Sequence, residues 1–135
     1  MSVHKSQQTP SNQQFVKTAR ELELYTIKKC VGFPKRYTFY VSERLANLAS
    51  TVYEECVKAN SIFPTKQWEY KLRRKHLVEA RASARALVAK IESAAELFDI
   101  DYEKIEYWMG FVDEEIRLLN GLLESDASRF KNLPE

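Results

Sequence analysis

Apolar residues recur at helical spacing along most of the chain and predict four helices. The clearest row lies in a helix expected from about Lys66 to Phe98 and consists of Leu77, Ala80, Ala84, Leu87, Ile91, Ala94 and Phe98. A similar row lies in a helix expected from about Tyr102 to Glu124 and consists of Tyr102, Ile105, Met109, Val112, Ile116, Leu119 and Leu123. Residues that alternate steps of three and four share one face of a helix, so each row predicts a side that faces the core.

The first half of the chain predicts two more helices, from about Gln13 to Val31 and from about Tyr40 to Asn60. In the earlier one, a first apolar stripe consists of Phe15, Ala19, Leu22 and Thr26, and a second of Leu24, Ile27 and Val31. The later helix has one apolar face, formed by Val41, Leu45, Leu48, Val52 and Cys56. Gly32 lies just beyond one pattern and Pro64 beyond the other, and they predict where each helix ends.

Four helices joined by short connections predict an all-α fold, an up-down-up-down antiparallel four-helix bundle over residues 13–126. The polar segment 1–12 predicts a disordered N-terminal tail, and residues 127–135 predict a short C-terminal tail. A length of 135 residues fits one domain, and a content of only 3 Gly and 4 Pro fits few, long elements.

The composition also bears on the compartment. No segment approaches the roughly 20 apolar residues of a membrane span, and the first residues contain no apolar run typical of a secretory signal. Cys30 and Cys56 lack the spacing of metal ligands, which favours reduced, buried thiols. We therefore expect a soluble cytoplasmic protein without a membrane partner.

Charge is distributed unevenly along the chain. Residues 66–90 carry 8 basic and 2 acidic side chains, whereas residues 91–127 carry 2 basic and 11 acidic ones. A basic face, about 100° round the helix from the apolar row, is predicted from Lys71, Arg74, Arg81 and Arg85, with Lys66, Arg73 and Lys75 extending it. Such a face fits a nucleic-acid backbone, because neutralising phosphates releases counterions. It equally fits a solvated surface, or pairing with the acidic last helix.

The same helix has a face of small residues, formed by Ala82, Ala86 and Ala89, roughly opposite the apolar row. Small side chains let another helix approach closely, so this alanine face predicts an interface between subunits. The alternative is that alanine occurs here because it favours the helix.

Sequence motifs for catalysis or metal binding are absent. The chain has no Gly-rich phosphate loop, no nucleophile elbow and no Cys-x-x-Cys pair, and its only histidines are His4 and His76. The carboxylates around Asp99 and Asp101 fit the N-terminal end of the last helix, as N-cap and first-turn residues. We therefore expect a protein that is not an enzyme and that uses no metal or cofactor.

The connection between the first two helices mixes aromatic and basic residues in the stretch GFPKRYTFYVSERL, residues 32–45. One interpretation is a packed corner, in which Phe33, Tyr37 and Phe39 fill the end of the core. Lys35 and Arg36 would then point outward. The other interpretation is a corner that also contacts nucleic acid or a partner through these two cations.

Three segments resemble a bacterial family of small four-helix-bundle proteins: FPKRYTFYVSERLANLA, EYKLRRKHLVEARASARALVAK and EIRLLNGLLES. One branch of the family comprises the accessory variability determinants of diversity-generating retroelements. The other comprises proteins encoded in the intervening sequences of bacterial large-subunit ribosomal RNA genes. The resemblance covers Leu22 to Ser125, and Ser42 departs from it where the family often has glycine.

The resemblance implies a ring-shaped homopentamer with no activity of its own. In the retroelement branch it also implies a reverse transcriptase as partner, together with its template RNA, held through a basic surface. Here the cations predicted to bind RNA or DNA are Lys71, Arg74, Lys75, Arg81 and Arg85, with Lys35 and Arg36 as additions. The alternative function is a structural, protein-interacting oligomer of the ribosomal RNA intervening-sequence type, without nucleic-acid binding.

Overall fold

A computed structural model describes residues 10–135, and this part of the chain is all-helical, without a strand. The four α-helices are α2 (Pro10–Val31), α3 (Glu43–Asn60), α4 (Gln67–Phe98) and α5 (Tyr102–Arg129). The predicted all-α class and the number of helices are confirmed. Residues 1–9 of the predicted N-terminal tail lie outside the described residues. Residues 10–12 belong to α2, and α5 continues through residues 127–129, which the sequence had placed in a C-terminal tail.

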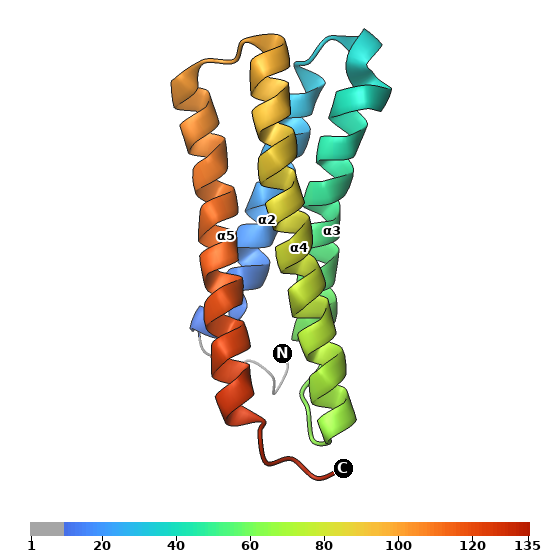
Figure 1. The fold of residues 1–135 in the computed structure, drawn as a ribbon, viewed down its shortest axis with the longest axis vertical. Coiled ribbons are helices and arrows are strands. Elements are labelled where there is room, and N and C mark those ends of the chain that lie inside the picture. Colours follow the sequence, from blue (N-terminus) through green and yellow to red (C-terminus); the bar gives the residue numbers. More distant parts are fainter. Residues whose placement is uncertain (1–9) are drawn as a thin grey trace.

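The helices lie side by side, each packed against two others (Figure 1). α2 contacts α3 and α5, and α4 contacts the same two helices, so the four surround one core. The α2–α3 and α4–α5 connections lie at one end of the bundle. The α3–α4 connection and the C-terminus lie at the other (Figure 1). None of the helices in residues 10–135 has the length and apolar content needed to cross a membrane.

The core contains one face from each helix. From α4 it takes the predicted row, with Leu77, Leu87 and Ile91 fully buried and Phe98 half-buried at the end. From α3 it takes Leu45, Val52 and Cys56, as the sequence predicts, together with Ala49 and Ala59. Burying each large aliphatic side chain stabilises the fold by about 1.5–3 kcal/mol relative to exposure. These rows therefore hold the helices together.

The buried face of α5 differs from the predicted one. Tyr102 is 74% exposed, and Ile105, Met109 and Ile116 are only half-buried. The centre of the buried face consists of Trp108, Val112, Glu115, Leu119, Leu122 and Asp126. Val112, Leu119 and Leu123 of the expected row are buried, whereas its other four members are not. The row missed the two acids of the buried face because it counted apolar residues alone.

One of these acids, Asp126, forms a buried ion pair with Arg73 of α4. Arg73 Nε donates a hydrogen bond to Asp126 Oδ2 at 2.6 Å, and Arg73 Nη1 donates to the carbonyls of Ala59 and Ile62 at 3.0 and 3.2 Å. Arg129 also donates to Asp126, from Nη2 at 2.8 Å. Arg73 is only 4% exposed, so the prediction that it extends the basic face was wrong. Its charge instead links the ends of α3, α4 and α5.

The other acid, Glu115, contacts Cys56 of α3. The Cys56 thiol donates a hydrogen bond to Glu115 Oε2 at 3.1 Å, and Glu115 Oε1 has no hydrogen-bond partner among residues 10–135. Burial raises the pKa of Glu115 to about 8, an effect that the hydrogen bond from Cys56 opposes and the nearby charge of Glu114 increases. Glu115 is therefore mostly protonated at neutral pH, which avoids a charged carboxylate in the core.

Of the two apolar stripes predicted on α2, only the first is buried in the core. Phe15, Ala19, Leu22 and Thr26 are buried, and Thr26 accepts a hydrogen bond from the indole of Trp108 at 3.0 Å. The second apolar stripe lies on the outside, with Leu24, Ile27 and Val31 exposed by 42%, 40% and 82%.

After Gly32, the chain forms a 3-10 turn, η1 (Lys35–Tyr37), and a π-helical turn, η2 (Thr38–Ser42). Phe33 and Tyr37 both pack on Phe98, as the packed-corner interpretation predicts. The ring centroid of Phe98 lies 4.6 Å from that of Phe33 and 5.2 Å from that of Tyr37. Phe39 does not join them and is 74% exposed. The buried residue of the π-helical turn is Ser42.

The α4–α5 connection uses its two aspartates for different purposes. Asp99 ends α4 in a left-handed conformation, with φ of 53°. Asp101 is the N-cap residue of α5, and its carbonyl accepts hydrogen bonds from the amides of Lys104 and Ile105. Only residues 99–101 join α4 to α5, and Asp101 and Lys104 line a pocket together with Lys28 and Lys29 of α2.

Candidate nucleic-acid interface

The predicted basic face lies on the outside of α4. The start of this helix is fixed by Glu69, whose Oε1 accepts hydrogen bonds from the Thr65 and Lys66 amides. These hydrogen bonds, of which the one from the Thr65 amide has the largest effect, lower the pKa of Glu69, so its carboxylate is charged at neutral pH. The first two turns then present Lys71 and Arg74 to solvent.

The five α4 cations predicted to bind nucleic acid differ in how free they are. Four of them are exposed: Lys71, Arg74, Lys75 and Arg85. Arg81 is half-buried, and its Nη1 donates a hydrogen bond to Oδ1 of Asn120 on α5 at 2.8 Å. None of the ion pairs within residues 10–135 includes any of the five. The positive charges of this face are therefore not neutralised by the acidic last helix of the same chain.

The alanine face adjoins a groove between α3 and α4. Ala82, Ala86 and Ala89 are all exposed. Ala86 lines a groove of about 330 Å³ together with Lys90 of α4 and Arg44 of α3. Sequence reasoning did not identify Arg44 or Lys90, because only the packing of α3 on α4 brings them together.

This groove combines charge with hydrogen-bonding groups. Asn47 and Thr51 of α3 line it beside Arg44, and neither Arg44 nor Lys90 belongs to an ion pair within the described part of the chain. Cations, an amide and a hydroxyl are the groups that most often contact the phosphates and sugars of nucleic acids.

Lys35 and Arg36 do not join the basic face. Both are exposed in η1, and the Arg36 guanidinium lies 5.2 Å from the centroid of the Tyr37 ring. Tyr37 packs on Phe98, at the far end of α4 from Lys71. At 1.5 Å per residue, Phe98 lies roughly 20 Å along the helix from Arg85. The two corner cations therefore form a separate site.

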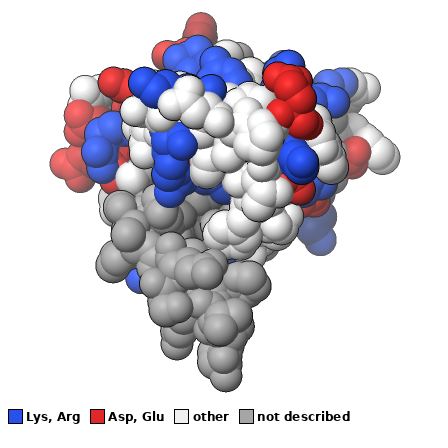
Figure 2. All heavy atoms as spheres, turned by 90° about the horizontal axis from the view of Figure 1, so that it is seen from below, with Lys and Arg blue, Asp and Glu red and all other residues white. Residues whose placement is uncertain are grey.

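At the end of the bundle opposite to Lys35 and Arg36, the basic side chains do not form a continuous patch either. Seen from the end that carries the α3–α4 connection, Lys and Arg side chains lie in several groups with Asp and Glu among them (Figure 2). The part of this end that is not covered in Figure 2 therefore presents no continuous basic surface. Trp68, at the start of α4, is 61% exposed.

The thiols and the described histidine do not form a nucleophilic pair. His76 Nδ1 lies 2.7 Å from Glu55 Oε1, and the buried Cys56 donates to Glu115. Burial raises the pKa of Cys56 far above its usual range, and burial raises that of Cys30 to about 11. Both thiols are free and protonated at neutral pH. Within residues 10–135, no three metal-binding side chains converge.

Comparison with known proteins finds no relative of this chain. Neither a protein-family model, nor a curated protein, nor a solved structure matches this chain. The family resemblance stated from the sequence therefore stays a prediction.

Proposed function

We propose that this chain is a non-enzymatic accessory protein that binds the backbone of RNA or DNA along α4 and serves a reverse transcriptase. The observation that carries the proposal is the row of cations on α4, of which Lys71, Arg74, Lys75 and Arg85 are exposed and none is in an ion pair within the described residues. A charged row that is left open to solvent along one helix suits a polyanion, whose phosphates repeat along a line.

The proposal includes the architecture that this function would use. The helices would run up-down-up-down and antiparallel, which is supported by the placement of successive connections at opposite ends of the bundle (Figure 1). Copies of the chain would form a ring, a homopentamer by resemblance, with Ala82, Ala86 and Ala89 at the contact. Exposure of all three alanines supports this part. The reverse transcriptase and the cytoplasmic location are supported by the sequence resemblance and composition alone.

Charge reversal on α4 tests the proposal. The test variant changes Arg74, Arg81 and Arg85 together to Glu. The control changes three exposed cations outside α4, Lys17, Arg20 and Lys131, to Glu, so that the net charge of the two variants is equal. Binding of a fluorescent structured RNA would be measured by anisotropy over a series of salt concentrations, with helicity and particle mass measured in parallel.

The expected result is a large loss of binding in the α4 variant alone. For double-stranded nucleic acid, log K changes with log salt by about 0.9 for each phosphate contact, so three lost contacts lower the slope by roughly 2 to 3. Equal losses in both variants would mean that only net charge matters. Binding that survives in the α4 variant would exclude the basic face as the site.

The alternative function is an interaction module that does not bind nucleic acid. It is favoured by the acidic segment 91–127, because the α4 cations of one molecule could pair with carboxylates of another. In that case the particle would ignore RNA at every salt concentration, and the α4 charge reversal would lower the particle mass. The position of the gene also separates the two functions. A neighbouring reverse transcriptase gene supports the accessory function, and insertion in a ribosomal RNA gene supports the interaction module.

A further inference from the structure

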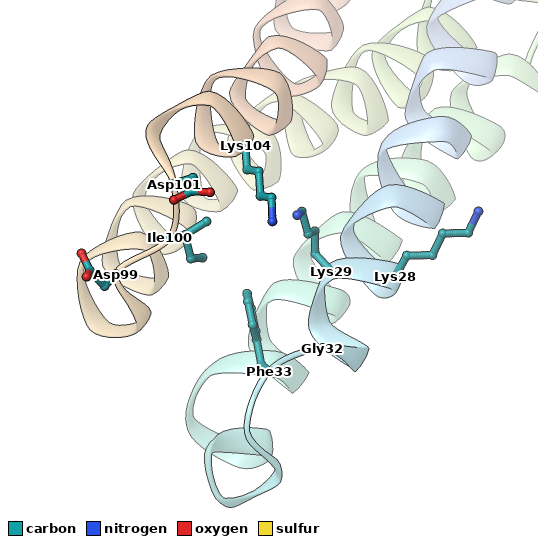
Figure 3. A pocket seen from close by; sticks show the side chains of 8 residues that line it. All are labelled: Lys28, Lys29, Gly32, Phe33, Asp99, Ile100, Asp101 and Lys104. Atoms are coloured by element: carbon teal, nitrogen blue, oxygen red, sulfur yellow. The ribbon is translucent and has the colours of Figure 1, made fainter.

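A pocket of about 430 Å³ lies at the end of the bundle where α2 ends and α5 begins (Figure 3). Its walls come from segments far apart in the sequence: the last turn of α2 with Phe33 on one side, and the α4–α5 connection with Lys104 on the other. The volume lies within the range of sites for small molecules, about 300–1,000 Å³. It is far from the basic face, because Phe33 packs on Phe98, the last residue of α4.

Two ammonium groups reach into this pocket from opposite walls. Lys29 of α2 and Lys104 of α5 point toward each other across it, whereas Lys28 extends away from them (Figure 3). Lys29 is half-buried, and its Nζ lies 5.7 Å from the centroid of the Tyr25 ring. No ion pair within residues 10–135 includes any of the three lysines. Facing ammonium groups repel each other, and an anion between them would turn that repulsion into attraction.

The other walls indicate what the rest of the ligand would be. The Phe33 ring is held in place by Phe98 and Trp108, at centroid distances of 4.6 and 6.4 Å, and it forms a rigid apolar wall together with Ile100. The Asp101 carboxylate lines the pocket near Lys104 (Figure 3). An ionised carboxylate only accepts hydrogen bonds, so it suits hydroxyl groups and repels a bare anion.

We propose that this pocket binds a small organic phosphate that carries hydroxyl groups, of the mononucleotide or sugar-phosphate class. Lys29 and Lys104 hold the phosphate, Asp101 accepts hydrogen bonds from the hydroxyl groups, and Phe33 contacts the apolar or ring portion. The site is independent of nucleic-acid binding along α4. It is also too small for a duplex, so its ligand is a free small molecule.

The experiment is a calorimetric titration of the full chain with adenosine 5′-monophosphate, ribose 5-phosphate, adenosine and inorganic phosphate at one ionic strength. The test variant is Lys29→Gln with Lys104→Gln. The control is Lys17→Gln with Lys131→Gln, which removes the same charge from exposed positions outside the pocket. A charge-assisted hydrogen bond contributes enough that losing both lysines weakens binding by about tenfold or more.

Saturable binding of the two organic phosphates, lost in the test variant and kept in the control, is the expected result. The Asp101→Asn variant should reduce the preference for ribose 5-phosphate over inorganic phosphate. Three results would overturn the proposal: no saturable binding of any phosphate, equal affinity for inorganic phosphate, or equal affinity for adenosine. The α4 charge-reversal variant should bind these ligands normally, so failure of the nucleic-acid proposal and failure of this one can be told apart.

Discussion

Replacing Glu115 by Gln should change how the stability of the fold depends on pH. The carboxyl group is fully buried, contacts Cys56 and has a pKa of about 8, against 4.5 for an ordinary glutamate. Between these two values, the unfolded chain has lost the proton of Glu115 and the folded chain keeps it. The unfolded state then binds fewer protons, so the free energy of unfolding falls as pH rises.

The size of the effect follows from the two pKa values. The contribution is fully present below about pH 4.5, falls by about 1.4 kcal/mol per pH unit, and levels off above about pH 8, where the folded chain also ionises. From pH 5 to pH 8 the loss is therefore about 4 kcal/mol, an upper value because the folded chain can relax around a charged carboxylate. Glu115→Gln removes the titrating group and with it this slope.

Urea denaturation at pH 5, 6, 7 and 8, followed by circular dichroism, measures the effect. Other groups titrate in the same range, so the quantity of interest is the difference in unfolding free energy between wild type and Glu115→Gln. That difference should change steadily with pH. Glu124→Gln is the control on the same helix, because Glu124 is exposed and belongs to none of the ion pairs within residues 10–135. A difference that stays constant from pH 5 to pH 8 would refute the burial of an acid at this position.

Three further substitutions test separate parts of the structure. Asp126→Ala leaves the Arg73 guanidinium buried without its carboxylate and should lower the free energy of unfolding, measured with urea, by about 3–5 kcal/mol. The double variant Arg73→Met with Asp126→Leu should recover part of this loss, and no recovery would mean that the unpaired charge is not its cause. Thr26→Val removes the acceptor of the Trp108 indole and should cost about 1–3 kcal/mol by the same assay, whereas Thr26→Ser should cost less. In the proposed homo-oligomer, Ala86→Glu should lower the particle mass in light scattering with helicity unchanged, and an unchanged mass would exclude the alanine face as a subunit contact.

The positions of the helices could be predicted from the sequence because the apolar rows and the helix-ending residues agree. α2 ends at Val31, directly before Gly32, and α4 ends at Phe98, as the pattern indicates. The same reasoning found only part of the buried face of α5, because Glu115 and Asp126 occupy core positions. A pattern of apolar residues cannot find a buried acid, because its burial depends on a protonation state or on a partner such as Arg73 from another helix.

The exposure of single side chains was harder to predict than their helix. Leu24, Ile27 and Val31 have helical spacing, but one helix in a bundle of four can bury only one broad face, and Phe15 and its row already occupy it. The misplacement of Phe39 has a local cause, since nothing in the sequence marks the π turn that directs it outward.

The two candidate sites show the same limit. The basic face of α4 could be predicted because one helix supplies it, although Arg73 and Arg81 needed the packing of α5 to be placed. The pocket near Lys29 and Lys104 could not be predicted at all. Its parts come from α2, the α4–α5 connection and α5, and only the fold brings them together.

The two acids in the core of α5 have a consequence for which bundle the sequence can form. Apolar rows that repeat every seven residues would pack almost as well if α5 slid along its neighbours by one repeat. A slide in one direction would bring Leu119 to the place of Asp126, and a slide in the other would leave that place beyond the end of α5 at Arg129. In both cases the Arg73 charge loses its carboxylate. It would also move Glu115 away from Cys56. Both slipped arrangements thus carry an electrostatic cost that the native one avoids, so the buried pair favours the native alignment of α5.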